Sequence, residues 1–487
     1  MTTSEPNIEF NFDNTYARSL TGFYTLWEGE KAPDPQMVRL NLPLAKELGL
    51  DASALNGVAG AEIFSGSRAP KGADTLAQIY AGHQFGGFSP QLGDGRALLL
   101  GEVIDIDGNR RDIHLKGSGR TPFSRGGDGK AALGPILREY IIGEAMHALN
   151  IPTTRALAVV TTGEDIMREA PLPGAVLARI AASHIRVGTF QYFAARGELD
   201  KIKQLADYVI ARHYPHLEKN ENPYLSLLST VCDRQAFLIA KWMLVGFVHG
   251  VMNTDNMTVS GETIDYGPCA FIDNYDPNAL FSSIDGKGRY AYKNQPQMAH
   301  WNLTRLAETL LPLINEDSER AIEKATSVLE AFPKIYGTYW LEGMRAKLGL
   351  TTEEEEDFAL ASDLLLAIEG QDVDYTNLFR SLADLSKEDE GLPCLKDWLP
   401  RWHERCAKET VSHSERNAAM NKVNPIYIPR NHLVEEALTA AVSDGDCSKF
   451  ETLMETLEQP FETRSGYERY AMPAPQDFGP YKTYCGT

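Results

Sequence analysis

Apolar and polar positions follow different patterns in the two halves of this chain. In the first half, an apolar run over residues 97–106, a turn at 107–109 and a second apolar stretch over 113–116 predict a β-hairpin. Apolar residues at helical spacing over 135–149 predict a helix, and residues 153–163 predict another strand. In the second half, helical patterns predict helices over 201–212, 225–249, 296–314, 318–335 and 353–370.

These elements predict an α+β fold with the two-lobed plan of a protein kinase, in which a small strand-rich lobe with one key helix precedes a larger helical lobe. Because many functions share one fold, this plan does not identify the activity. We expect an N-terminal extension over residues 1–80, a lobe with nucleotide-binding loops over 81–200, a helical lobe with the catalytic loop and a metal site over 201–400, and a C-terminal extension over 401–487. The tail after Pro460 is expected to lie over other parts of the molecule.

A run of four glutamates follows Thr352. Threonine at an N-cap and acids in the first turn both stabilise a helix, so this run predicts a helix that starts here. Cation binding by these glutamates is the weaker interpretation.

The composition narrows the function classes. A chain of 487 residues with 43% hydrophobic residues is large enough for a substantial buried core. Its net charge of -20 disfavours sequence-independent binding of nucleic acid, which needs an excess of Lys and Arg. The N-terminal residues have neither a secretory nor a transit-peptide pattern. The most apolar run, residues 236–252, is shorter than the roughly 20 residues of a bilayer span. We therefore expect a cytoplasmic monomer with no nucleic-acid or membrane partner.

The six cysteines are scattered along the chain without any C-x-x-C pair. This spacing fits a reducing compartment and disfavours a cysteine zinc site. Cys485 lies almost at the chain end, where exposure is expected.

Residues 247–257, FVHGVMNTDNM, resemble the catalytic loop of a protein kinase without its catalytic residue. His249 and Asn256 keep the separation of the H-R-D-x-x-x-x-N motif, but Val251 stands where the Asp belongs. Phosphoryl or nucleotidyl transfer needs oxygen ligands for Mg²⁺ beside the phosphates, and Asn256 and Asp265 are the candidates. The segment MTVSGETI between them predicts a short hairpin that would bring the two together.

Asp255 is the candidate proton acceptor, because it directly precedes Asn256 and could take a proton from a substrate hydroxyl. The alternatives are that Asp255 only caps the loop, and that Asn253, Asp255 and Asn256 only shape a turn. The H-G before this segment and the D-Y-G-P after it favour a metal site.

Lys116 and Glu139 form a predicted ion pair in the first lobe. Lys116 lies on the predicted strand with His114, opposite Ile113 and Leu115. Taken alone, such a lysine is more often a solvated edge residue. Glu139, however, shares a helix face with apolar residues and should point inward, where it needs a cation. Lys116 is the nearest suitable charge, so we expect the two to pair as in kinases.

Two glycine-containing loops and two arginines are candidates for phosphate contacts. The loops are QLGDGR, with Gly93, Gly95 and Arg96, and SRGGDGK at 124–130, whose backbone N–H groups can bind an anion. Either loop could be an ordinary turn. Arg179 and Arg186 lie in an otherwise apolar segment and need anionic partners if they are buried, either phosphates or core acids.

Six segments of the chain now form a recognisable set: YAGHQFGGFSPQLGDGRA, DIHLKGSGRTPFSRGGDGKAALGPILREYI, VLARIAASHIRVGTFQYFA, HGVMNTDNM, IDYGPCAFID and GRYAYKNQPQMAHWNL. Together they resemble the selenoprotein O family, called YdiU in bacteria. The resemblance is dense from about Tyr80 to Leu303 and continues more loosely to the C-terminus.

The resemblance implies a pseudokinase fold that binds ATP in a flipped orientation and transfers AMP to Ser, Thr or Tyr hydroxyls of proteins, with release of pyrophosphate. It implies Mg²⁺ or Mn²⁺ at Asn256 and Asp265, Asp255 as proton acceptor, and inward γ-phosphate binding by Arg179 and Arg186. The positions that match the family's nucleotide contacts are Gly93, Gly95, Arg96, Lys116, Asp128, Gly129, Arg179 and Arg186.

One departure concerns redox control, which this family is thought to exert through a disulfide between the C-terminal tail and the loop after the D-Y-G. Many eukaryotic members carry a selenocysteine near the C-terminus, where this chain has Cys485. Cys269 lies in the loop after the D-Y-G, so the resemblance implies a possible Cys269–Cys485 bridge. The alternative is that Cys269 is only a buried core residue.

Two other functions remain open for the sequence. One is a true kinase with Asp255 as its base, and the other is a nucleotide-binding regulator without turnover. The sequence favours AMP transfer, because Val251 removes the usual kinase base while the metal-ligand candidates persist.

Overall fold

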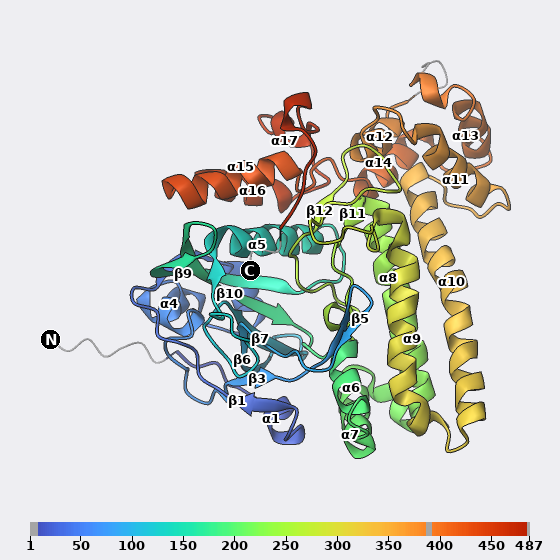
Figure 1. The fold of residues 1–487 in the computed structure, drawn as a ribbon. Helices are drawn as coiled ribbons and strands as arrows, with labels where there is room; N and C mark the ends of the chain where they lie inside the picture. Colours follow the sequence, from blue (N-terminus) through green and yellow to red (C-terminus); the bar gives the residue numbers. More distant parts are fainter. Residues whose placement is uncertain (1–7, 386–391, 485–487) are drawn as a thin grey trace.

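The computed structural model describes residues 8–385 and 392–484 (Figure 1). Its centre is an eight-stranded sheet in the order β1-β3-β6-β7-β10-β9-β2, with β8 beside β10. All the pairings in this sheet are antiparallel. The strands are β1 (Tyr24–Leu26), β2 (Gln36–Leu40), β3 (Leu76–Gln78), β6 (Ala97–Ile104), β7 (Arg110–Lys116), β8 (Ala131–Ala132), β9 (Arg155–Met167) and β10 (Pro171–Ala181).

The predicted hairpin is confirmed as β6 and β7. Its turn is closed by Asp105, whose Oδ1 accepts from the backbone N–H groups of Asp107 and Asn109, while Gly108 takes a φ of 84° that favours glycine. Ile113 and Leu115 point into one apolar core, and Lys116 lies on the opposite side of β7, at the cavity described below. This alternation determines which side chains of β7 can reach a ligand.

Helix α5 (Leu133–Ala148) lies across one face of the sheet, between the strands and the C-terminal helices α15 (Asn431–Thr439) and α16 (Ser448–Leu457) (Figure 1). This helix was predicted to start at residue 135, and it starts two residues earlier, at Leu133. Contacts on both sides bury most of its length, including Leu137, Ile141 and Glu139. A charge on this helix is thus held inside the molecule.

The long helices of the second half are α7 (Leu199–His213), α8 (Pro223–Val245), α9 (Gln295–Ile314), α10 (Ser318–Leu348) and α11 (Asp357–Ile368). Helices α8, α9 and α10 lie side by side, away from the sheet (Figure 1). Helix α7 instead reaches the sheet, because its Arg212 pairs with Glu102 on β6 and Asp112 on β7. The five predicted helices are thus confirmed, but α8 ends at Val245 because Gly246 adopts a left-handed C-cap. The chain then forms β11 (Phe247–Val248), which pairs with β12 (Ala270–Phe271).

Two local predictions were wrong. Helix α11 begins at Asp357 and not at Thr352, whose hydroxyl instead donates to Glu409, so the glutamates precede the helix. The segment 257–264 does not form a paired hairpin. It makes a turn in which Glu262 N donates to Thr258 Oγ1, and Thr258 and Thr263 bridge to Arg186 and Thr153.

The first and last described segments of the chain are integrated into the fold. Strands β1, β2 and β3 belong to the central sheet, so residues 24–78 contribute directly to it. As expected, the tail after Pro460 lies over other parts: Tyr481 contacts Arg138 on α5, and Thr483 pairs with Ser282. The remaining helices are α1 (Thr15–Ser19), α2 (Leu42–Glu47), α3 (Ala52–Leu55), α4 (Val58–Phe64), α6 (Val187–Ala194), α12 (Tyr375–Leu382), α13 (Leu399–Cys406), α14 (His413–Val423) and α17 (Glu468–Ala471).

The α+β class is confirmed by this antiparallel sheet and the helices around it. The kinase-like arrangement of two lobes stays a prediction. Within residues 8–385 and 392–484, no helix is both long and apolar enough to cross a membrane.

Candidate active site

A cavity of about 640 Å³ lies between the sheet and the loop that follows β11. Every residue predicted to touch nucleotide or metal lines it. They are Gly93, Gly95, Arg96, Lys116, Asp128, Gly129, Arg179, Arg186, Asp255, Asn256 and Asp265. The fold therefore brings together residues that are up to 172 positions apart in the sequence.

Asp265 is the electrostatic centre of the cavity. Its Oδ1 lies 2.9 Å from Lys116 Nζ and 2.6 Å from Arg179 Nη1, and its Oδ2 lies 3.8 Å from Arg186 Nη1. Burial alone would raise the pKa of Asp265, but the charges of Lys116, Arg179 and Arg186 outweigh burial and hold this pKa well below its ordinary value. Asp265 stays ionised, and three cations surround it.

The backbone at Asp265 is also unusual, with a φ of +62°. Only a few residue types other than glycine tolerate this left-handed conformation, and aspartate is one of them. The conformation turns the carboxylate toward the cations, while the next residue, Tyr266, is buried and bonded to the Thr153 hydroxyl. The D-Y-G segment is thus anchored on its Tyr side and open to the cavity on its Asp side.

Lys116 and Glu139 form the predicted ion pair. Both side chains are buried, Lys116 on β7 and Glu139 on α5. Because a buried glutamate is costly without a cation, the pair fixes the position of α5 relative to the sheet. Glu139 does not line the cavity itself, so its contact with the site passes through Lys116.

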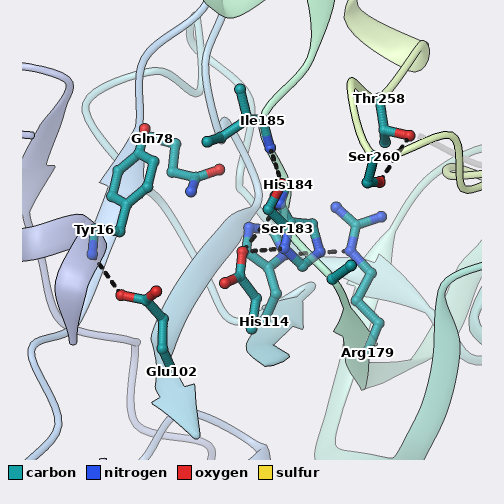
Figure 2. A network of polar contacts seen from close by, with 12 residues as sticks. Tyr16, Gln78, Glu102, His114, Arg179, Ser183, His184, Ile185, Thr258 and Ser260 are labelled. Carbon is teal, nitrogen blue, oxygen red and sulfur yellow. Dashed lines mark hydrogen bonds and ion pairs between the residues drawn. The ribbon is translucent and has the colours of Figure 1, made fainter. Parts of the chain in front are cut away.

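Arg179 is oriented by a buried histidine that the sequence did not single out for this task (Figure 2). Arg179 on β10 is the register partner of His114 on β7, and Arg179 Nε donates to His114 Nδ1 at 3.2 Å. The other ring nitrogen, Nε2, lies 3.1 Å from Asp94 Oδ2. Burial lowers the pKa of His114, so the ring is neutral, accepts from Arg179 and donates to Asp94.

Asp255 and Arg186 each present an atom without a hydrogen-bond partner among the described residues: Asp255 Oδ1 and Arg186 Nη2. The other carboxylate oxygen of Asp255 accepts from Gln84 Nε2 at 3.3 Å, and Arg186 Nη1 donates to the Asp255 carbonyl at 3.3 Å. Burial raises the pKa of Asp255 to about 6. Buried polar atoms are normally satisfied, so these two atoms leave unused hydrogen-bonding capacity beside the cavity.

The glycines of the two loops are required by close packing. A side chain at Gly93 or Gly95 would collide with Phe123, and one at Gly129 would collide with the backbone at Gly119. The loops therefore lie directly against each other, with Arg96 at the cavity. Asp128 forms an ion pair of 2.6 Å with Arg168. The sequence did not predict Arg168 as a site residue, because it lies 40 positions after Asp128, just beyond the end of β9.

The two predicted metal ligands, Asn256 and Asp265, both line the cavity. Asn256 Nδ2 donates to the Val251 carbonyl at 3.0 Å, which fixes the amide and leaves its Oδ1 as an acceptor. Asn256 and Asp265 thus supply amide and carboxylate oxygens, the ligand types that Mg²⁺ and Mn²⁺ prefer. No group of three or more His, Cys, Asp or Glu side chains suited to a metal occurs in the part of the chain that the structure describes. Further ligands would have to come from substrate phosphates or water.

The predicted disulfide cannot be located, because Cys485 lies outside the described residues. Cys269 is buried. The last described part of the tail reaches the same loop, where Thr483 Oγ1 donates to the Pro268 carbonyl at 2.8 Å.

Comparison with known proteins agrees with the geometry. The model of one family, described as Protein adenylyltransferase SelO, matches residues 6–458. The chain belongs to the SelO family. It is 59% identical to a Cereibacter sphaeroides protein called protein nucleotidyltransferase YdiU, over 99% of this chain and all of the relative. A Rhizobium johnstonii protein of the same name is 55% identical over 99% of both chains.

The match to the SelO family is wider than the resemblance based on motifs, which was dense only between about Tyr80 and Leu303. It includes the strands of residues 24–78 and helices α11 to α15, which carry none of the motifs. Asp94 and His114, which were not predicted as site residues, lie inside the quoted segments, whereas Arg168 lies outside these segments but within the matched range.

Proposed function

We propose that this protein transfers AMP from ATP to Ser, Thr or Tyr hydroxyls of other proteins and releases pyrophosphate. Membership of the SelO family supports a nucleotidyltransferase with ATP and a protein as substrates. The observation that carries the proposal is the cavity itself, where three cations converge on Asp265 beside two unpartnered atoms, Arg186 Nη2 and Asp255 Oδ1.

The charges suit a triphosphate. The combined positive charge of Lys116, Arg179 and Arg186 exceeds the negative charge of Asp265, even though Glu139 partly neutralises Lys116. A polyphosphate would supply the missing acceptors for Arg186 Nη2, and forked guanidinium donors match phosphate oxygens. In the flipped orientation, Arg179 and Arg186 hold the γ-phosphate deep in the cavity, so the α-phosphate faces the acceptor.

Asn256 and Asp265 would hold Mg²⁺ or Mn²⁺. The metal, when bound, neutralises charge on the phosphates. Lys116 and Arg179 keep Asp265 ionised and oriented, and the Val251 carbonyl orients the Asn256 amide. The protein's contribution to this step is positioning, which alone supplies a large part of catalysis.

Asp255 accepts the proton of the attacking hydroxyl. Its Oδ1 has no hydrogen bond from described residues, so this lone pair is available to a substrate, while Gln84 holds the other oxygen. The oxygen of the hydroxyl then attacks the α-phosphorus, the bond to the bridging oxygen breaks, and pyrophosphate leaves. Val251 at the kinase base position fits this shift of the base to residue 255.

The kinase-like arrangement, the cytoplasmic location and the monomeric state are further parts of this proposal. The buried Lys116–Glu139 pair, which joins a strand to the helix across it, and Asp265 in the D-Y-G support a kinase-like site.

The test uses ATP labelled at the α-phosphate in parallel with ATP labelled at the γ-phosphate. Label should enter protein only from the α-position, and pyrophosphate should appear in equal amount. Label from the γ-position alone would mean a kinase. No transfer from either position, with ATP binding retained, would mean a regulator without turnover. Asp265→Asn serves as the control that carries the same fold without the carboxylate.

A further inference from the structure

The hairpin of β4 (Gly82–Gln84) and β5 (Gly87–Ser89) lies directly on the proposed catalytic loop. Backbone N–H groups of His83 and Phe85 donate to the side chains of Thr254 and Asn253, at 2.6 and 3.0 Å. Gln84 contacts Asp255 from the same strand. In Figure 1, β5 lies where the sheet faces helix α9, so the hairpin is the outer wall of the cavity on the Asp255 side.

The turn of this hairpin is strained. Phe85 and Gly86 both have positive φ, 52° and 87°, and phenylalanine is rarely found in that conformation. The turn directs the Phe85 ring into the cavity lining, 5.3 Å from the ring of Tyr290. Strain of this kind persists where the surroundings fix it, often at ligand-binding sites.

Arg289 lies beside this turn, where its backbone N–H donates to Asp285 Oδ1 at 3.0 Å, and its side chain forms no ion pair within the described part of the chain. Its guanidinium stacks over Trp301 at 4.6 Å and lies next to Gly86. Its Nε is buried and donates no hydrogen bond to any described residue. Arg305, on the same tryptophan, differs because it pairs with Glu308 at 2.7 Å. Arg289 therefore presents a guanidinium that Trp301 holds in place and no carboxylate neutralises, directly beside the hairpin that contacts Asp255.

The nucleotide does not explain Arg289. This residue is absent from the lining of the 640 Å³ cavity, whereas Phe85 and Gln84 of the hairpin belong to it. Arg289 is therefore on the outer side of the hairpin, where a macromolecular acceptor has to approach in order to present a hydroxyl to Asp255. A guanidinium stacked on an aromatic ring is well suited to bind a carboxylate there.

We propose that the β4–β5 hairpin, Arg289 and Trp301 form an acceptor surface that binds a segment of the target protein carrying an acidic residue near the modified hydroxyl. The inference rests on the proposed function. Gln84, which contacts Asp255, and Gly86, which lies against the Arg289 guanidinium, are two residues apart in the hairpin turn. An extended acceptor therefore places its Asp or Glu two to four residues from the hydroxyl. The protein's overall negative charge opposes this pairing little, because salt screens charges beyond about 8 Å.

The test uses synthetic peptides with one Ser, Thr or Tyr, flanked at positions two to four by Asp, by Lys or by Ala, and ATP labelled at the α-phosphate. The wild type should have a KM for the Asp peptides about tenfold below that for the Lys peptides, with similar kcat, since a charge-assisted hydrogen bond contributes about that factor. Arg289→Glu should invert the preference, and Arg289→Gln should remove it. The KM for ATP should stay unchanged in both variants. Arg320→Glu is the matched control, because the Arg320 side chain is exposed in the first turn of α10 and belongs to neither the cavity lining nor the acceptor surface.

The outcomes separate this inference from the proposed function. Transfer of AMP by the wild type with equal KM for all peptides overturns the acceptor surface alone, and so does a preference for Asp that survives in Arg289→Gln. Absence of α-label transfer to every peptide and to the protein itself overturns the proposed function, and the acceptor surface with it.

Discussion

Two carboxylates in this protein are each surrounded by cations, but only one of them lies at a cavity. Asp265 contacts Lys116, Arg179 and Arg186. Asp357, at the start of α11, accepts from Arg345 Nε at 2.7 Å and from Arg405 Nε at 2.6 Å. The side chain of Asp357 is fully buried, whereas that of Asp265 is 19% exposed.

The difference lies in how the remaining groups are satisfied. Around Asp357 the charges balance, because Arg405 also pairs with Glu409, which accepts from Thr351 and Thr352. None of the four charged side chains has a buried atom without a partner in the described structure. Around Asp265 the cations are in excess, and Arg186 Nη2 and Asp255 Oδ1 are unpartnered. A closed, balanced cluster stabilises a fold, and an open, unbalanced one leaves binding capacity for a ligand.

The largest expected effect is that of Asp265→Asn on AMP transfer. Asparagine tolerates the left-handed backbone and keeps the shape of the side chain, but it loses the charge that would hold the metal and orient Lys116 and Arg179. Transfer from α-labelled ATP should fall by about 10³-fold or more. Circular dichroism should show a folded protein, because solvent and anions reach this cavity. Near-normal transfer would contradict the central role of Asp265.

Asp255→Asn should have the next largest effect, about 10²-fold on kcat, because the amide cannot accept the proton of the hydroxyl. Binding of ATP should remain near that of the wild type, since the Asp255 side chain bonds to Gln84, and the bond from Arg186 goes to the Asp255 backbone carbonyl, which the substitution keeps. Equilibrium binding of a fluorescent ATP analogue checks this separation. A parallel loss of binding and turnover would mean that Asp255 shapes the loop, the alternative that the sequence left open.

Asp357→Asn should behave in the opposite way to Asp265→Asn. It leaves Arg345 and Arg405 buried without their carboxylate, so the free energy of unfolding should drop by about 3 kcal/mol. Denaturant titration measures this loss. The protein that remains folded at low temperature should transfer AMP at the wild-type rate, because none of these residues lines the cavity. A loss of activity without a loss of stability would erase the distinction between the two clusters.

The sequence predicted the residues around Asp265 better than those around Asp357. Lys116 and Glu139 were paired correctly because alternation along a strand and apolar spacing along a helix determine where each side chain points. The motifs predicted correctly that Asp265, Arg179 and Arg186 lie at the same site. Thr352 was misassigned because its hydroxyl bonds to Glu409, 57 residues away, and no local pattern reveals such a partner.

Long-range register explains what else was missed. His114 and Arg179 meet only because β7 pairs with β10 in one particular register, and Asp94 joins them from a loop. The end of α8 at Gly246 and the turn at residues 257–264 likewise depend on contacts with β12, Thr153 and Arg186. Local propensity gives an element's type more readily than its boundary or its partner.

The smallest expected effect concerns His114, which orients Arg179. Two substitutions test its two hydrogen bonds separately. His114→Gln places an amide near Nε2, which can still donate to Asp94 but leaves Arg179 Nε without its acceptor. His114→Asn places a carbonyl near Nδ1, which keeps the acceptor for Arg179 and loses the bond to Asp94.

If His114 positions Arg179 for the phosphates, the glutamine variant should raise the KM for ATP about tenfold, the cost of one lost charge-assisted bond, while kcat changes little. The asparagine variant should keep the KM of the wild type and lose stability instead, because the buried Asp94 carboxylate then loses the His114 donor and keeps only the Gln78 backbone N–H. Equal KM values in the two variants would show that the ring only fills space between β7 and β10, and the open cluster would then depend on Lys116 and Asp265 alone for the orientation of Arg179.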